Sequence, residues 1–282
     1  MPGSVVHTFT IVLSLDMAKA GINGIELNYA DKGQGVPIIL IHGHPFDHTM
    51  WDPQIAAFSK HYRIIAPDLR GYGKSSLPDP ANTRFEDYGT DVVRLADYLG
   101  VDSFHLGGLS MGGQIIMEIY RQALSRVKSL ILADTFASLD TPEAKQARNE
   151  GAKRLEKEGM NGYAGQSIFK MLKSDHVASM PEVSGHVLKM MKATSPVAAA
   201  TAMRARSARI DYLNELLPKV SVPALIIVGR QDEFTPVAKA EEMQQKLQNS
   251  RLVVIEDAGH MPNLEHPDEF NKAVLDFLKS VE

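Results

Sequence analysis

The chain of 282 residues contains no cysteine. This absence excludes disulfide bonds, a cysteine nucleophile and thiolate metal sites, although it leaves the cellular compartment open. No apolar run approaches the roughly 20 residues that a helix needs to cross a bilayer, so we expect no membrane span. The net charge is only −4, which gives no reason to expect a nucleic acid as partner.

The N-terminal stretch MPGSVVHTFTIVLSLDMAKA has a modest apolar centre but no basic region before it. We therefore expect a cytoplasmic protein, with a signal peptide ending near Ala20 as the weaker alternative. Two further alternatives stay open for residues 1–16. They are an extension upstream of a natural start at Met17, or an added edge strand, because VVHTFTIVL is rich in β-branched residues.

Short runs that are apolar at nearly every position recur along the chain, as in PIILIHG, SLILAD and ALIIVG. Strands that are covered on both faces show this pattern. The predicted strands are Ile25–Ala30, Ile38–His42, Arg63–Pro67, Phe104–Leu109, Val127–Ala133, Ala224–Gly229 and Leu252–Glu256. Amphipathic patterns between them predict helices at Met50–Lys60, Phe85–Leu99, Gly112–Leu124, Pro236–Gln248 and Pro267–Lys279. This alternation predicts an α/β fold with a mostly parallel, doubly wound sheet.

The alternation stops between Ala137 and Tyr212, where the sequence contains several helical patterns and no convincing strand. We therefore predict a core of residues 1–136 and 213–282 and a helical cap of residues 137–212. The cap holds 12 lysines and arginines against eight acidic residues, whereas the whole chain is negative. It also holds six of the 13 methionines, which in helices more often serve core packing than ligand binding.

Ser110 lies in GLSMGG, where a predicted strand ends and a predicted helix begins. A tight turn between a strand and a helix strains the backbone at its central residue. Gly108 and Gly112, two positions on either side, remove side chains that would collide with the facing strand and helix. Such a turn projects the hydroxyl at the carboxyl edge of the sheet, where open α/β sheets bind ligands. We interpret Ser110 as a nucleophile; the alternative is a helix-capping serine.

Five segments resemble the α/β-hydrolases, and specifically their group of small esterases, lactonases and cofactor-free haloperoxidases. In chain order they are LIHGHPFDHTMWDPQ, RIIAPDLRGYGKSS, GLSMGG, VPALIIVGRQDEFTP and AGHMPNLEHPDEFN. The resemblance extends from about Gly24 to Leu278 and implies the α/β-hydrolase fold with a helical cap insertion. It also implies that DLRGYGKSS is a structural turn. That segment lacks the glycine spacing of a phosphate-binding loop.

A serine hydroxyl needs an adjacent base to act as a nucleophile at neutral pH. His260 follows the last predicted strand, so its loop reaches the same edge of the sheet as Ser110, and it matches the late catalytic histidine of the family. The runner-up is His266, which precedes a proline at a predicted helix start. The base in turn needs a carboxylate to hold its tautomer. Asp232 follows a neighbouring strand and completes the order expected for this fold, while Asp134, after another strand, is the rival.

The tetrahedral intermediate of acyl transfer also needs preorganised hydrogen-bond donors. Met111, the residue after the nucleophile, offers its backbone N–H. The resemblance places the second donor in HGHP, at the backbone of His44. No cluster of histidines and carboxylates has zinc-like spacing, so we expect no metal and no cofactor.

These residues predict a serine hydrolase that cleaves a small carboxylic ester or lactone through an acyl-enzyme. An enol-lactonase or a perhydrolase on the same triad is an alternative. A hydrolase-fold receptor for a small molecule is an alternative of a different class. Arg204, Arg206 and Arg209 could bind a carboxylate on the substrate, or they form a solvated helix face. The sequence leaves the substrate and the oligomeric state open.

Overall fold

The computed structural model describes residues 17–77 and 79–282. The signal peptide, upstream extension and added strand considered for residues 1–16 therefore lie outside the described residues. Within the part of the chain that is described, no helix is both long and apolar enough to traverse a bilayer.

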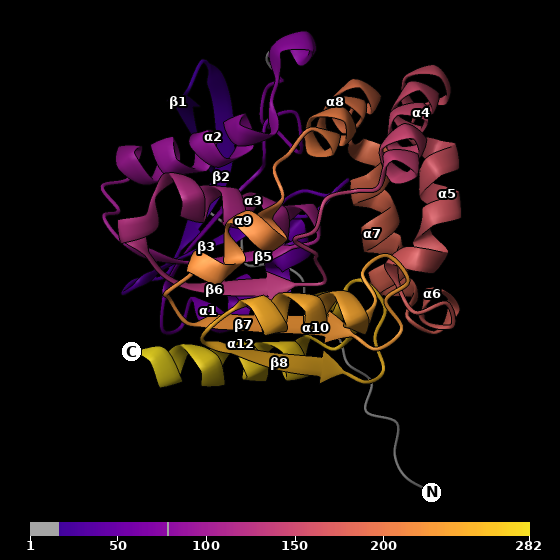
Figure 1. Cartoon of the computed structure of the whole chain (residues 1–282). Helices are drawn as coiled ribbons and strands as arrows, with labels where there is room; N and C mark the ends of the chain where they lie inside the picture. Colours follow the sequence, from indigo (N-terminus) through magenta and orange to yellow (C-terminus); the bar gives the residue numbers. More distant parts are fainter. Residues whose placement is uncertain (1–16, 78) are drawn as a thin grey trace, which may run out of the picture.

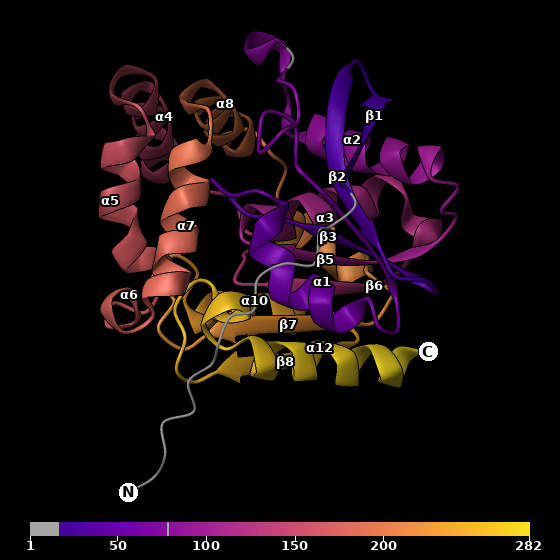
Figure 2. The same ribbon diagram turned by 180° about the vertical axis from the view of Figure 1, so that it is seen from behind.

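Eight strands of the described chain form a single sheet with the order β1-β2-β4-β3-β5-β6-β7-β8 (Figures 1 and 2). Strand β2 runs antiparallel to both of its neighbours, β1 and β4, and all other neighbours are parallel. The predicted α/β fold with a mostly parallel sheet is thus confirmed. The strands are β1 (Met17–Ile22), β2 (Ile25–Lys32), β3 (Pro37–Ile41), β4 (Arg63–Pro67), β5 (Phe104–Leu109), β6 (Val127–Ala133), β7 (Ala224–Gly229) and β8 (Ser250–Ile255).

Strand β1 is absent from the set of strands predicted above. Its sequence, MAKAGI, is poor in the β-branched and aromatic residues that favour strands. The signal that identifies it is the turn that follows. Asn23 and Gly24 both have positive φ, at 50° and 79°, and an Asn-Gly pair of this kind favours a two-residue hairpin. This turn pairs β1 with β2 from Ile22 opposite Ile25 onward.

Helices cover both faces of the sheet, which explains why its strands are apolar on both sides. Helices α2, α3 and α10 pack on one face, and α1 and α12 pack on the other (Figures 1 and 2). Their bounds are α1 (Asp52–Phe58), α2 (Phe85–Tyr98), α3 (Met111–Gln122), α10 (Val237–Lys246) and α12 (Pro267–Val281). The predicted helices are all present, with ends that differ by a few residues.

Between β6 and β7 the chain forms a group of helices beside the carboxyl ends of the strands (Figure 1). We call α4–α8 the cap. Their bounds are α4 (Pro142–Glu158), α5 (Met160–Met171), α6 (His176–Ser179), α7 (Pro181–Ala193) and α8 (Pro196–Ser207). Four of the cap methionines are buried: Met160, Met171, Met190 and Met191. They pack in the hydrophobic clusters, in agreement with a packing role. The chain continues through α9 (Tyr212–Glu215) to β7 and ends with α11 (Pro262–Glu265) and α12.

Candidate active site

Ser110 occupies the turn between β5 and α3. Its backbone has φ 58° and ψ −117°, a conformation that costs a non-glycine residue about 1–3 kcal/mol. The flanking glycines make the turn sterically feasible. A Cβ on Gly108 would lie 2.3 Å from the carbonyl oxygen of Gly112, and a Cβ on Gly112 would lie 2.2 Å from that of Ile41. Strand, turn and helix therefore approach too closely for a larger residue at either position.

His260 and Asp232 form a buried hydrogen-bonded pair at the ends of β8 and β7. Nδ1 of the imidazole lies 2.8 Å from Oδ2 of the carboxylate. The carboxylate also accepts hydrogen bonds from the backbone N–H groups of Phe234 and Thr235 and from the Thr235 hydroxyl. Burial acts to raise the pKa of Asp232, but His260 and Thr235 outweigh it and lower that pKa to about 2. Asp232 is therefore ionised at neutral pH and holds a proton on Nδ1, which leaves Nε2 as the basic nitrogen.

Asp134, the rival carboxylate, lies beside this pair rather than far from it. It follows β6 with a positive φ of 42°, and its Oδ1 accepts the backbone N–H of Gly229 at 2.9 Å. One carboxylate oxygen of Asp134, one of Asp232 and a ring nitrogen of His260 all lie within 4.8 Å of one another. Complete burial, and next the negative charge of Asp232, raise the pKa of Asp134 well above its usual value. The pKa values of the two acids are therefore shifted in opposite directions, and the acid with the lowered pKa contacts His260.

Glu265 supports the loop that carries His260, and the sequence analysis missed it. One carboxylate oxygen accepts the backbone N–H of Gly259 at 2.9 Å. The other accepts the backbone N–H of Lys173 at 2.8 Å and lies 2.7 Å from Nδ1 of His176. Lys173 and His176 belong to the cap, so one buried carboxylate connects the cap to the backbone beside the imidazole. A Cβ on Gly259 would lie 2.4 Å from the backbone nitrogen of Lys173, which shows how closely the two segments pack.

The loop after β3 packs directly against the nucleophile turn. A Cβ on Gly43 would lie 3.0 Å from the carbonyl oxygen of Leu109 and 3.3 Å from Cβ of Ser110. His42 shapes this loop: its Nε2 accepts the backbone N–H of Leu69 at 2.9 Å, so Nδ1 carries the proton that it donates to Gly43. On the other side of Ser110, Met111 begins α3. The first N–H groups of a helix have no acceptor within the helix and carry its positive dipole end.

The His44 side chain is held in the interior beside the cap. Its Nδ1 lies 2.7 Å from the Tyr72 hydroxyl, and its ring meets that of Tyr163 edge-on with centroids 6.2 Å apart. Burial, and then the positive charges of Arg206 and Arg148, lower the pKa of His44 to about 3. The ring is therefore neutral at physiological pH, and its buried Nε2 has no hydrogen-bond partner among the described residues.

His266 and the segment DLRGYGKSS, both singled out in the sequence, form contacts outside the pair of Asp232 and His260. Nε2 of His266 bonds the backbone carbonyl of Asp257 at 2.6 Å, so the runner-up base has a different partner from the Asp232 carboxylate that bonds His260. In DLRGYGKSS, Asp68 accepts the backbone N–H groups of His48 and Lys74 and the side chain of Asn28. This segment is a structural turn around the buried Asp68, as the resemblance implies.

Three groups of described residues place potential metal-ligating atoms within 4.8 Å of one another. They are Asp134, Asp232 and His260; Asp47, His48 and Asp68; and His176, Asp257 and His266. In each group a histidine is already hydrogen-bonded or ion-paired to a carboxylate. These bonds account for the three arrangements, and the lack of a metal stays a prediction.

The three arginines that the sequence groups, Arg204, Arg206 and Arg209, have separate environments. Arg204 is exposed and forms a bidentate ion pair with Glu156 at 2.6 Å. Arg209 is buried and pairs with Asp140 at 3.4 Å. Arg206 turns into the protein, where its Nε donates to the Gln114 side chain on α3. The sequence grouped these arginines, but the structure distinguishes them. Arg204 forms an exposed ion pair, Arg209 forms a buried one, and Arg206 contacts the helix that follows the nucleophile turn.

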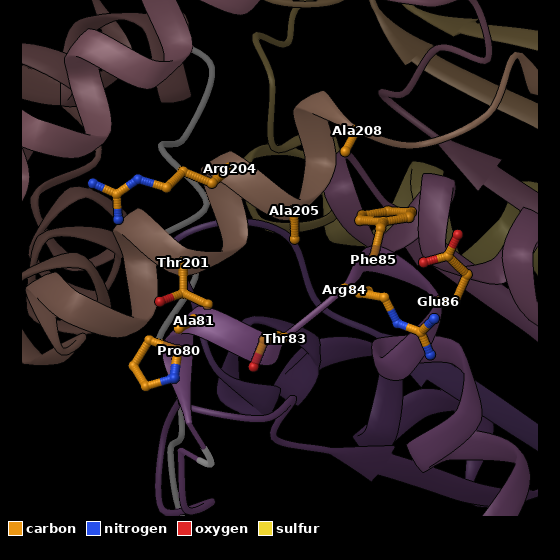
Figure 3. A pocket seen from close by; sticks show the side chains of 10 residues that line it. All are labelled: Pro80, Ala81, Thr83, Arg84, Phe85, Glu86, Thr201, Arg204, Ala205 and Ala208. Atoms are coloured by element: carbon orange, nitrogen blue, oxygen red, sulfur yellow. The ribbon is translucent and has the colours of Figure 1, made fainter.

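A surface groove of about 580 Å³ lies between α8 and the segment that leads into α2 (Figure 3). None of Ser110, Asp232 and His260 lines it. Arg204 and Arg84 lie on opposite sides of this groove (Figure 3), and each has an acidic partner. The groove is therefore distinct from the site around Ser110.

Comparison with known proteins agrees with this fold. A family model for the alpha/beta hydrolase fold matches residues 36–267. The chain is 31% identical to 3-oxoadipate enol-lactonase 2 of Acinetobacter baylyi over 90% of this chain and 94% of the relative. A thermophilic esterase from Thermogutta terrifontis, solved with malate bound, is 35% identical with a TM-score of 0.89 over 94% of this chain and 98% of the other. An enol-lactonase from Burkholderia xenovorans LB400 is 32% identical with a TM-score of 0.86 over 93% and 100%.

The protein belongs to the α/β-hydrolase family. Its similarity to esterases and enol-lactonases supports a hydrolase activity.

Proposed function

We propose that the protein is a serine hydrolase of small carboxylic esters or lactones, with Ser110, His260 and Asp232 as its catalytic triad. The observation that carries the proposal is the buried bond between Asp232 and His260, at the same sheet edge as the strained turn of Ser110. A nucleophile, a charged carboxylate and a base in this chain order define the triad chemistry of the fold.

In this mechanism His260 removes the proton from the Ser110 hydroxyl as Oγ attacks the carbonyl carbon. The backbone N–H groups of His44 and Met111 stabilise the oxyanion of the tetrahedral intermediate. The C–O bond to the leaving alkoxide breaks, and the imidazolium of His260 donates its proton to the alkoxide. The product is an ester of Ser110, which a water molecule deprotonated by His260 then hydrolyses. Asp232 stabilises the imidazolium in both halves of the reaction.

A lactone fits the same steps. Its leaving oxygen stays attached to the acyl chain, so hydrolysis of the acyl-enzyme releases one product, a hydroxy acid or its keto form. Perhydrolysis differs only in the final nucleophile, which is hydrogen peroxide instead of water. The relatives named as esterases and enol-lactonases favour hydrolysis as the main reaction.

A receptor function has less support. The exposed large apolar side chains of the described chain come from six separate segments: Tyr98, Leu124, Leu139, Phe169, Val197 and Phe234.

The test is the hydrolysis of 4-nitrophenyl acetate by the wild type, by Ser110→Ala and by a control variant, Ser103→Ala, at an exposed position. We expect Ser110→Ala to lose at least about 10³-fold in kcat, in line with the removal of a triad nucleophile. Mass spectrometry of quenched wild-type enzyme should detect a serine ester on the peptide that contains Ser110. Undiminished turnover by folded Ser110→Ala would refute the proposal.

A further inference from the structure

Arg206 is fixed next to the helix that carries the nucleophile turn. Its Nε donates to Oε1 of Gln114 at 2.5 Å, and its guanidinium lies over the Phe136 ring, 5.3 Å from the centroid. Gln114 is fully buried, and its backbone N–H bonds the carbonyl of Ser110 at 3.3 Å. Its side-chain amide also donates to the carbonyl of Phe136. The position of the guanidinium is therefore set by residues one turn from the nucleophile.

Arg206 forms no ion pair within the described part of the chain, although the charge of Asp140 acts to raise its pKa. Its neighbours Arg148 and Arg209 share a single carboxylate, Asp140, at 2.9 Å and 3.4 Å. Arg206 itself forms no ion pair with any described carboxylate. Burial, and then the charges of Arg148 and Arg209, lower the pKa of Arg206 well below its usual value. A half-buried cation without an ion pair is costly, and an anion bound here would relieve that cost.

The charge of Arg206 acts on residues of the loop beside the nucleophile turn. Its charge acts on three rings that lie together, those of His44, Tyr72 and Tyr163. The backbone of His44 is the proposed oxyanion donor, and the Nε2 atom of this residue is buried without a partner. When the Tyr72 hydroxyl donates to Nδ1, Nε2 carries the proton and is a second unoccupied donor beside the cation. A ligand that binds both the Arg206 guanidinium and the N–H at Nε2 of His44 would carry acceptor oxygens and a negative charge.

We propose that Arg206 binds a carboxylate of the substrate and that the substrate is therefore an anionic ester or lactone, with this carboxylate separate from the scissile acyl group. The inference rests on the proposed function and names the substrate class for it. Of Arg204, Arg206 and Arg209, it assigns this role to Arg206, because Arg204 and Arg209 have acidic partners. A guanidinium suits this role because its planar fork can bind both carboxylate oxygens.

The experiment compares anionic and neutral esters of matched length. The anionic series is the mono-4-nitrophenyl esters of glutaric, adipic and pimelic acid. The neutral series is 4-nitrophenyl hexanoate, heptanoate and octanoate, with spontaneous hydrolysis subtracted in each case. For the wild type we expect kcat/KM to be higher for the best anionic ester than for its neutral match. In Arg206→Gln this ratio should fall by about 10- to 100-fold, the range for one charge-assisted bidentate contact. Arg206→Lys keeps the positive charge but not the planar guanidinium. Its ratio of kcat/KM values should lie between those of the wild type and Arg206→Gln.

Arg204→Gln is the matched control, since it removes an arginine from the same helix, two residues away, whose charge is already paired. We expect its ratio to equal that of the wild type. A wild type that hydrolyses both series equally would overturn the inference, and so would an equal loss on both series in folded Arg206→Gln. If Arg206→Gln does not fold, competitive inhibition of wild-type heptanoate hydrolysis by adipate, but not by hexanediol, gives the same test. The proposed function fails separately, through hydrolysis of the neutral series that persists in Ser110→Ala.

Discussion

The buried carboxylate of Glu265 lies 2.7 Å from the imidazole of His176 and 2.9 Å from the backbone nitrogen of Gly259. His176 begins α6 in the cap, and Gly259 directly precedes His260 in the core. The position of the proposed base is thus coupled to that of the cap through one side chain. Arg206 belongs to α8 of the same cap, so the cap contacts both the loop of the proposed base and the helix that begins at the nucleophile turn.

Replacement of Glu265 should affect both stability and catalysis. Glu265→Ala leaves the buried donors of Lys173, His176 and Gly259 without an acceptor, and we expect a loss of about 3 kcal/mol or more in the free energy of unfolding. Because the loop that holds His260 also loses its support, kcat on a neutral ester should fall at least 10-fold. Urea denaturation and steady-state kinetics measure the two effects. The exposed Glu269, at the start of α12, supplies the control Glu269→Ala, and an equally small effect of both variants would contradict the prediction.

The two acids near His260 should have very different effects on activity. Asp232→Asn replaces the charged partner of the imidazole, so we expect kcat to fall by about 10³- to 10⁴-fold. Asp134→Asn replaces a neutral acid by an amide of similar shape that still accepts the Gly229 N–H, and kcat should stay within about threefold of the wild type. The measurement is kcat on 4-nitrophenyl acetate at pH 7.5 for both variants. The reverse order would transfer the role of triad acid to Asp134.

The glycine after the nucleophile turn should tolerate no side chain. A Cβ at Gly112 meets the backbone oxygens of Ile41 and His42, which cannot move without displacing the central strand β3. We expect Gly112→Ala to cost about 3 kcal/mol or more of stability, seen as a large fall in the midpoint of thermal unfolding. Gly165→Ala is the control, because a Cβ there meets nothing within 4 Å in the middle of α5. It should raise stability by up to about 1 kcal/mol.

The parts of the site that sequence could predict are those that depend on local pattern. Ser110 was predictable because the glycines that make its turn possible are neighbours in the chain. Asp232 and His260 were predictable because parallel strands bring their carboxyl ends to one edge of a sheet. Glu265 was not predicted, and Arg206 was grouped with Arg204 and Arg209 without being distinguished from them, because each acts through partners about 90 residues away, with separations of 89 and 92 positions. The local sequence does not indicate which distant carboxylate will form an ion pair with a given arginine.

The stability of Asp134→Asn relative to the wild type should depend on pH. Asp134 has a folded-state pKa raised above its usual 3.8, so the folded protein keeps a proton that the unfolded chain has lost above that pH. The stabilisation is complete below pH 3.8 and decreases as the pH rises toward the folded-state pKa. Over this interval the wild type should lose about 1.4 kcal/mol per pH unit relative to Asp134→Asn, which has no proton to lose. Urea denaturation of both proteins at pH 5, 6 and 7 measures this difference, with the exposed Asp102→Asn as control. A difference that stays constant with pH would mean that Asp134 ionises like an ordinary aspartate and that the triad holds two charged acids.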